Sequence, residues 1–153
     1  MHSGRQSGPR NNLMWSHYGD NHKGICLQFK VSKDLGILKR LVQVSYSDNY
    51  PTINWLSPSF DQQCLYAATN KQSCWSYENE WRYVQLNSAR TSVPFAPSLL
   101  AGIILGAKAS ETALSEVRRI LDMRAKLGLT SVQIYRATLS PGLYGIQVHG
   151  LTA

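Results

Sequence analysis

Short stretches of alternating apolar and polar residues surround one amphipathic helical segment, and this combination limits the chain to a mixed α+β fold. The helical segment is 110–127, where Ser110 is a suitable N-cap and Gly128 follows the last turn. A shorter helix is predicted over 60–70. Strands are predicted over residues 24–31, 42–46, 80–86, 99–105, 132–139 and 143–148. We therefore expect a β-rich α+β domain whose strands are mostly antiparallel.

The apolar content of the chain predicts one domain with one core. Its 153 residues are 43% apolar, which is enough for one domain and too little for two. We expect residues 1–12 to be a polar, disordered leader and residues 13–153 to form the domain. No apolar stretch approaches the roughly 20 residues that cross a membrane. The leader has no apolar core of the secretory type, so we expect a cytoplasmic protein without membrane contacts.

Basic residues exceed acidic ones, and the formal net charge is +7. Residues 1–40 hold seven basic and two acidic side chains, so the excess is greatest toward the amino end. No long basic run exists, although the pairs Lys39–Arg40 and Arg118–Arg119 could contact phosphate. A solvated helix face explains the second pair equally well. Nucleic acid therefore stays open as a partner and is not indicated by charge alone.

The first group of chemically capable side chains occupies residues 14–26, directly before the first predicted strand. Loops in such positions commonly hold functional groups. The candidates that we select here are Trp15, Ser16, His17 and Tyr18. A polar turn anchored in the core by its tryptophan explains the same composition, so both interpretations stay open.

A zinc site is a further interpretation of the same segment. His17, His22 and Cys26 are separated by five and four residues, and this spacing fits structural zinc sites poorly. The three cysteines of the chain include no Cys-x-x-Cys pair, so we expect them to be reduced thiols. We therefore expect no metal.

The second group is Trp75-Ser-Tyr-Glu-Asn-Glu-Trp-Arg82, at the start of a predicted strand. Glu78 and Glu80 are two residues apart, so on an extended backbone both carboxylates face the same side, with Arg82 after them. Two close carboxylates can differ in pKa, and a guanidinium can keep one of them ionised. An ordinary ion pair between Glu80 and Arg82 is the alternative. Aromatic neighbours such as Tyr77 favour a site, because aromatic walls beside carboxylates suit a planar, cationic or ribosyl ligand.

Four segments of the chain resemble a bacterial family catalogued as domain of unknown function 2971. The segments are Leu13-Met-Trp-Ser-His-Tyr18, His22-Lys-Gly-Ile-Cys26, Trp75-Ser-Tyr-Glu-Asn-Glu-Trp-Arg82 and Ile103-Ile-Leu-Gly106. Typical members look longer at the amino end, with a Tyr-Lys-Tyr-Arg-like strand and an Asn-Asp-Pro-Phe-Glu-like segment. Neither is present here, so the resemblance implies a carboxyl-terminal portion of the family domain.

A weaker resemblance is to ADP-ribosyltransferases, whose sites combine an early Arg or His strand, a Ser-bearing strand and a Glu-x-Glu or Gln-x-Glu pair. It implies that Ser16 or His17 lies in the middle element and that Glu78 and Glu80 form the carboxylate pair. Glu80 would bond the ribose hydroxyl and stabilise the oxocarbenium-like state as nicotinamide leaves. Glu78 would orient or deprotonate the acceptor. These four residues are the predicted catalytic set.

The same resemblance implies NAD as co-substrate. Tyr18 or Trp15 would stack on nicotinamide, and Tyr77 and Arg82 complete the predicted cofactor-binding set. The first motif of those enzymes, which helps to hold NAD, has no counterpart in this sequence. An activity of this kind would suit a phage-defence or toxin setting, with a protein or nucleic acid as acceptor.

Two interpretations without catalysis stay open beside the enzyme. The chain could be an interaction module that binds nucleic acid or a protein partner through its basic residues and exposed aromatic rings. It could also be an inactive, truncated remnant that exposes surface which other strands should cover. Salt-dependent binding would indicate the first of these, and aggregation at low concentration would indicate the second.

Overall fold

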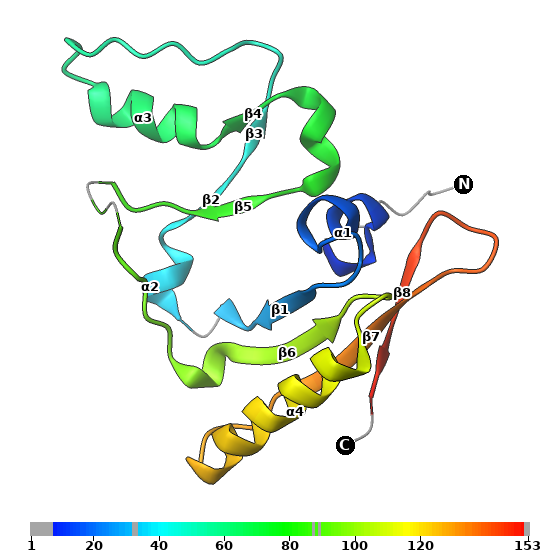
Figure 1. The fold of residues 1–153 in the computed structure, drawn as a ribbon. Coiled ribbons are helices and arrows are strands. Elements are labelled where there is room, and N and C mark those ends of the chain that lie inside the picture. Colours follow the sequence, from blue (N-terminus) through cyan, green and yellow to red (C-terminus); the bar gives the residue numbers. More distant parts are fainter. Residues whose placement is uncertain (1–7, 32–33, 87, 89, 152–153) are drawn as a thin grey trace. The chain divides into compact units, whose positions relative to one another are not determined.

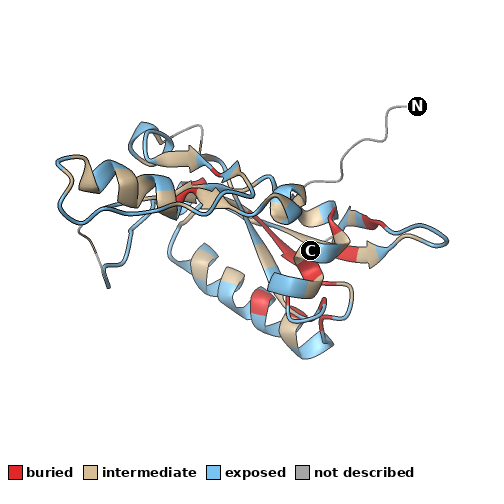
Figure 2. Cartoon of the chain, turned by 90° about the horizontal axis from the view of Figure 1, so that it is seen from above, coloured by how far each residue is buried: buried red, intermediate tan, exposed pale blue. Residues whose placement is uncertain are grey.

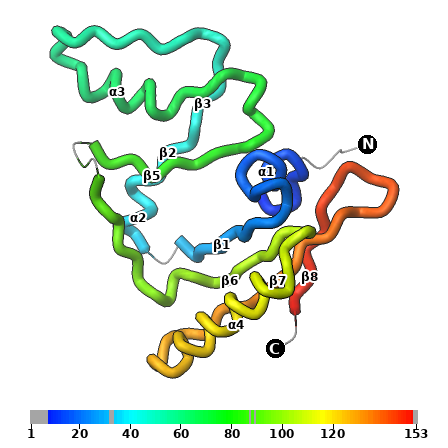
Figure 3. The backbone as a smooth tube through the Cα atoms, in the orientation of Figure 1, coloured from blue at the N-terminus to red at the C-terminus, as the bar shows by residue number. Residues whose placement is uncertain are grey.

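The structure is a computed structural model that describes residues 8–31, 34–86, 88 and 90–151. The chain divides into two compact units, of which one combines Met1–Lys33 with Phe95–Ala153 and the other is Asp34–Pro94. The chain therefore leaves the first unit after one strand, builds the second, and returns to the first, as can be followed along the tube in Figure 3. We call them the sheet unit and the insert unit and describe each by itself.

A four-stranded sheet with the order β1-β6-β7-β8 is the frame of the sheet unit (Figure 1). Its elements are β1 (Ile25–Phe29), the 3-10 helix η4 (Pro97–Leu99), β6 (Leu100–Leu105), β7 (Gln133–Leu139) and β8 (Ile146–Gly150). β6 pairs antiparallel with β1 and parallel with β7, and β7 pairs antiparallel with β8. The last four residues of β6 are buried. Burial on both faces explains why this strand is a continuous apolar run.

The helix α4 (Glu111–Lys126) covers one face of this sheet. Ser110 accepts a hydrogen bond from a backbone N–H of the first turn and so caps the helix. Leu114 and Val117 are buried in a cluster with residues of β6. The helix predicted over 110–127 is thereby confirmed, and its apolar face is the one that meets the sheet.

The helix α1 (Asn12–Tyr18) supplies the core of the opposite face, and the loop expected before β1 is therefore wrong for this segment. Asn11 caps the helix by accepting a hydrogen bond from the backbone N–H of Leu13, at 2.9 Å. Trp15 is 3% exposed. Its cluster contains the buried residues Ile104, Ala137 and Ile146. Burial of this large ring, which alternation along the chain does not indicate, stabilises a helix only two turns long.

The leader expected over 1–12 falls into two parts. Residues 1–7 lie outside the described residues. The remainder forms the 3-10 helix η1 (Gly8–Arg10) and the beginning of α1. From Gly8 onward the segment therefore has defined secondary structure.

The insert unit consists of short elements. They are α2 (Leu35–Leu38), β2 (Leu41–Gln43), β3 (Ser45–Tyr46), α3 (Phe60–Ala68), β4 (Asn70–Lys71), the 3-10 helix η3 (Ser73–Glu78) and β5 (Trp81–Tyr83). β2 pairs antiparallel with β5, and β3 pairs parallel with β4. α3 confirms the short helix predicted over 60–70. The strand expected over 42–46 is divided at Val44, whose N–H donates to the carbonyl of Glu80 while the next residue pairs toward β4.

Burial differs sharply between the two units. Buried positions, red in Figure 2, gather where the strands and α4 of the sheet unit meet. Within the described residues, Val44 is the one buried apolar side chain of the insert unit. The insert unit therefore depends more on hydrogen bonds and ion pairs than on an apolar core of its own.

The α+β class is confirmed, with three antiparallel and two parallel strand pairings among the described residues. The two predicted helices are present, and the predicted strands are shorter than expected in the insert unit. None of the helices in the described part of the chain has the length and apolar character needed to cross a membrane.

Candidate functional site

The four candidates of the first group occupy consecutive positions of α1, so their side chains point in different directions. Trp15 is buried, and its indole N–H donates to the carbonyl of Pro9 at 2.8 Å. Tyr18 is 60% exposed, and its ring meets the ring of exposed His17 edge-on with 6.2 Å between centroids. Of the two rings expected to stack on nicotinamide, Tyr18 therefore lies at the surface and Trp15 belongs to the core.

Ser16 contacts His22, which the sequence suggested only as a possible zinc ligand. Its Oγ lies 3.3 Å from Nε2 of His22 and 3.1 Å from the carbonyl oxygen of Asn12, to which it donates. The tautomer of the imidazole ring decides which of the two groups, Ser16 Oγ or His22 Nε2, donates in their contact. The contact fixes the orientation of the Ser16 hydroxyl next to the His22 ring.

His22 is a neutral, buried ring. It is 7% exposed, and burial lowers its pKa, with a further lowering by the positive charge of Lys108. Its Nδ1 is buried and has no hydrogen-bond partner among the described residues. A neutral imidazole with one unpaired nitrogen loses stability when it is protonated, since the charge would be poorly solvated there.

The backbone conformation of residues 20–22 explains why the His22 side chain contacts α1. Asp20, Asn21 and His22 all have left-handed φ values, of 45°, 50° and 72°. The N–H of His22 donates to the carbonyl of Trp15 at 3.2 Å, which closes the turn onto the helix. The Asp-Asn pair between two glycines is the sequence signal that could have indicated this turn, because these residue types tolerate the left-handed region.

The second group lies in the insert unit, and its backbone differs from the extended strand that we expected. Glu78 is the last residue of η3, and Asn79 follows with a left-handed φ of 47°. Glu80 precedes β5. The prediction that Glu78 and Glu80 project from one face of a continuous strand is therefore wrong, because the reversal at Asn79 separates the two local directions.

The two carboxylates nevertheless meet at a lysine. Nζ of Lys71 is 2.5 Å from Oε2 of Glu78 and 3.5 Å from Oε2 of Glu80. The side chain of Glu78 is 2% exposed and that of Glu80 is 29% exposed. Sequence spacing does not indicate Lys71, because the parallel pairing of β3 with β4 brings it to this position.

Arg82 fixes the charge state of Glu80. Its Nε lies 2.6 Å from Oε1 and its Nη2 lies 3.1 Å from Oε2, so the contact is bidentate. This hydrogen bonding lowers the pKa of Glu80 against the opposing effect of burial, and the charges of Arg82 and Lys71 lower it further. Arg82 also donates to the carbonyl of Ala68 at the end of α3. The Glu80 carboxylate is therefore held ionised and in a fixed orientation at neutral pH.

A pocket of about 860 Å³ lies beside this cluster, within the insert unit. Lys71 lines it, together with residues of the segments 47–53 and 70–72. The ring of Trp75 lies 4.8 Å from Nζ of Lys71, and Tyr77 contacts Trp75 with 6.0 Å between ring centroids. Lys71 thus connects the carboxylates, an aromatic ring and the pocket.

The predicted residues therefore form two sets, each inside one unit. Ser16, His17 and Tyr18 belong to the sheet unit, and Glu78, Glu80, Tyr77 and Arg82 belong to the insert unit. Across the described residues, no group of three or more His, Cys, Asp or Glu side chains is arranged to hold a metal ion. The chemistry that the second set supports is charge stabilisation by a fixed carboxylate beside two cations.

Comparison with known proteins gives a match to one family model. No curated protein and no solved structure matches the chain. Both candidate sets fall inside the segment 14–83, whereas β6 and α4 lie outside it. Over residues 14–83 the chain matches the family described as "Protein of unknown function (DUF2971)", which supports the resemblance drawn from the sequence.

Proposed function

We propose that this chain transfers ADP-ribose from NAD to an acceptor and that Glu80 is the carboxylate that stabilises the reacting sugar. The observation that supports this most directly is the ionised state of Glu80, whose pKa is lowered by Arg82. Cleavage of the bond between ribose and nicotinamide develops positive charge on the sugar, and an ionised carboxylate stabilises such charge. Because 29% of the Glu80 side chain is exposed, a bound ribose can reach it.

The pocket beside Lys71 supports a dinucleotide as the ligand. Its volume of about 860 Å³ lies in the range of roughly 300–1,000 Å³ that small-molecule sites occupy. Lys71 lines the pocket and offers a cation for phosphate there, although it also pairs with Glu78 and Glu80. Trp75 and Tyr77 lie outside the lining, and Trp75 reaches the site through its contact with Lys71.

In the proposed step the bond between ribose C1′ and the nicotinamide nitrogen breaks, and nicotinamide leaves with the bonding electron pair. The acceptor nucleophile forms the new bond to C1′ and loses its proton to solvent water. Glu78 is 2% exposed and bound to Lys71, so we assign it to positioning Lys71 and not to the acceptor. A part for Ser16, His17 and Tyr18 in the same reaction stays a prediction.

The test uses NAD labelled in the ADP-ribose part, mixed protein and nucleic-acid acceptors, and a separate assay for released nicotinamide. Glu80→Gln should lower both signals by at least about a hundredfold, since it removes the charge and keeps the shape. Glu116→Gln is the matched control, because it also removes a carboxylate paired with arginine, on the exposed face of α4. The control should keep the activity of the unchanged chain. No release and no transfer by folded, unchanged protein would overturn the proposal.

A non-catalytic module that binds nucleic acid is the second candidate, and the distribution of charge favours it. The segments that make up the sheet unit hold eleven basic and four acidic residues, whereas the insert unit holds five of each. The net charge of +7 therefore belongs entirely to the sheet unit. A surface with such an excess attracts phosphate backbones without reading their sequence.

Titration with a labelled oligonucleotide at several salt concentrations distinguishes the two candidates. A module of this kind should bind with an affinity that falls steeply as salt rises, and it should release no nicotinamide from NAD. Absence of binding at low salt would remove this candidate. Glu80→Gln should leave such binding unchanged, because Glu80 belongs to the neutral insert unit.

A further inference from the structure

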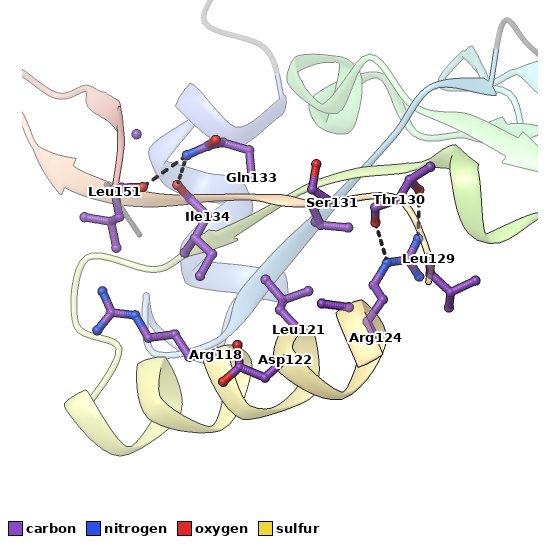
Figure 4. A pocket seen from close by; sticks show the side chains of 13 residues that line it. Arg118, Leu121, Asp122, Arg124, Leu129, Thr130, Ser131, Gln133, Ile134 and Leu151 are labelled. Carbon is purple, nitrogen blue, oxygen red and sulfur yellow. Dashed lines mark hydrogen bonds between the residues drawn. The ribbon is translucent and has the colours of Figure 1, made fainter. Parts of the chain in front are cut away.

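A second pocket lies within the sheet unit, outside the segment that matches the known family. It has a volume of about 760 Å³ and is lined by α4, by the segment 129–134 and by the end of β8. Figure 4 shows Leu121 rising from α4 while Ile134 and Leu151 point toward it from the sheet side. Leu129 and Val132 complete an apolar lining. A ligand that fits here must have an apolar body.

Internal hydrogen bonds fix the frame of this pocket. Arg124 donates to the carbonyl of Thr130 at 2.9 Å, to its hydroxyl at 3.2 Å, and to the carbonyl of Pro97. The side-chain amide of Gln133 donates to the carbonyls of Leu151 and Ile134, at 3.1 and 3.2 Å. The pocket is therefore formed before any ligand binds, which lowers the entropic cost of binding.

One cation at the pocket is available to a ligand. Arg118 makes no hydrogen bond or ion pair with another described residue. Arg124 instead donates hydrogen bonds to the carbonyls of Thr130 and Pro97. Asp122 is the one acidic residue of the lining, so the lining carries a net charge of +1. A single negative charge on the ligand balances this, and the charge excess of the whole sheet unit favours the same sign.

We propose that this pocket binds an amphipathic monocarboxylate with an unbranched apolar chain of about ten carbons or more. The chain lies along Leu121 and Ile134, and the carboxylate pairs with the guanidinium of Arg118 at the pocket margin. This site is independent of the Glu80 cluster, since every lining residue belongs to the sheet unit.

The test titrates the full chain, labelled with ¹⁵N, with laurate below its micelle concentration. Amide shifts should change at Leu129, Val132, Ile134 and Leu151, and the fitted affinity should weaken about tenfold in Arg118→Gln. Arg119→Gln is the matched control, because Arg119 is the next residue of α4 and is already paired with Glu116 at 2.6 Å. The control should bind laurate as the unchanged chain does.

Two further ligands test the contributions of the carboxylate charge and of the apolar chain separately, and they need no variant that could misfold. Dodecylamine has the same chain with the opposite charge, and butyrate has the same charge without the chain. Both should bind at least about tenfold more weakly than laurate. Equal binding of laurate and dodecylamine, laurate shifts outside this pocket, or equal loss in the two arginine variants would each overturn the proposal.

Discussion

Arg82 holds the Glu80 carboxylate through two nitrogens, with Nε 2.6 Å from Oε1 and Nη2 3.1 Å from Oε2. Lys71 adds a second cation, whose Nζ is 3.5 Å from Oε2 of Glu80. This network lies in a unit where, among the described residues, burial of apolar side chains is limited to Val44. Changes in the charge of this network should therefore have measurable effects on the stability of the insert unit.

The first prediction concerns the acid stability of the fold. The pKa of Glu80 is lowered below its ordinary 4.5 in the folded chain, so the folded state binds fewer protons than the unfolded state there. The contribution of Glu80 is complete above about pH 4.5 and is lost as the pH falls through the lowered pKa. Urea unfolding between about pH 7 and about pH 3 should show this loss in the unchanged chain and a smaller loss in Glu80→Gln. Identical pH profiles would contradict the assignment.

The second prediction concerns the buried pair of Glu78 and Lys71. Glu78→Leu leaves Lys71 with only its longer contact to Glu80, at 3.5 Å, and should destabilise the chain by about 3 kcal/mol. Replacing both partners, as Glu78→Leu with Lys71→Met, removes the lysine charge as well and should recover most of that loss. Denaturant unfolding of the two single variants and the double variant measures the coupling. Additive effects would show that the pair is not coupled.

The third prediction concerns His22, whose pKa is lowered by burial. A lowered histidine pKa means that the unfolded chain takes up the proton first as the pH falls. The free energy of unfolding should therefore decrease as the pH falls below about 6.5 toward the folded pKa, and then level off. His22→Asn removes the titrating ring and tolerates the left-handed φ of 72°, so its profile should be flat in this window. A profile of the variant that still falls there would assign the effect to another group.

The long helix was predictable because its signals are local. Ser110 caps it, its apolar residues recur on one side, and a glycine follows it. α1 was not predictable in this way, because the burial of Trp15 depends on Ile104, Ala137 and Ile146, which are distant in the sequence. The helix is two turns long, so tertiary packing and not propensity decides its conformation.

The candidate site follows the same division. Sequence spacing offered an ion pair of Glu80 with Arg82 as one of two interpretations, and the contact of 2.6 Å confirms that the pair forms. Spacing could not indicate the left-handed conformation of Asn79. The residue before it, Glu78, is buried and forms an ion pair with Lys71. Lys71 reaches the carboxylates through a strand pairing between segments about 25 residues apart, as in the register of Ser45 with Asn70. Non-local pairing of this kind leaves no mark on local patterning.

The fourth prediction concerns the contact between Gly106 and the turn that carries His22. A Cβ at position 106 would lie 2.1 Å from the carbonyl oxygen of His22 and 2.6 Å from its carbon, so backbone would have to move. The same oxygen accepts a hydrogen bond from the N–H of Lys108, and the N–H of Gly106 donates to Gly24, both at 2.9 Å. Gly106→Ala should therefore destabilise the sheet unit by about 3 kcal/mol or more, through loss of these bonds and displacement of His22.

Gly142→Ala is the matched control for this substitution. Gly142 has a left-handed φ of 70°, and a Cβ there would meet nothing within 4 Å. The control should cost only the strain of a left-handed alanine, about 1 kcal/mol. Thermal unfolding compares the two variants, and NMR of the His22 ring reports whether its pKa rises toward 6.5 in Gly106→Ala. Equal stability of the two alanine variants would mean that the turn at His22 adjusts freely and would contradict the prediction. A much lower stability of Gly106→Ala, together with a changed His22 titration, would assign the loss of stability to the contact between Gly106 and His22.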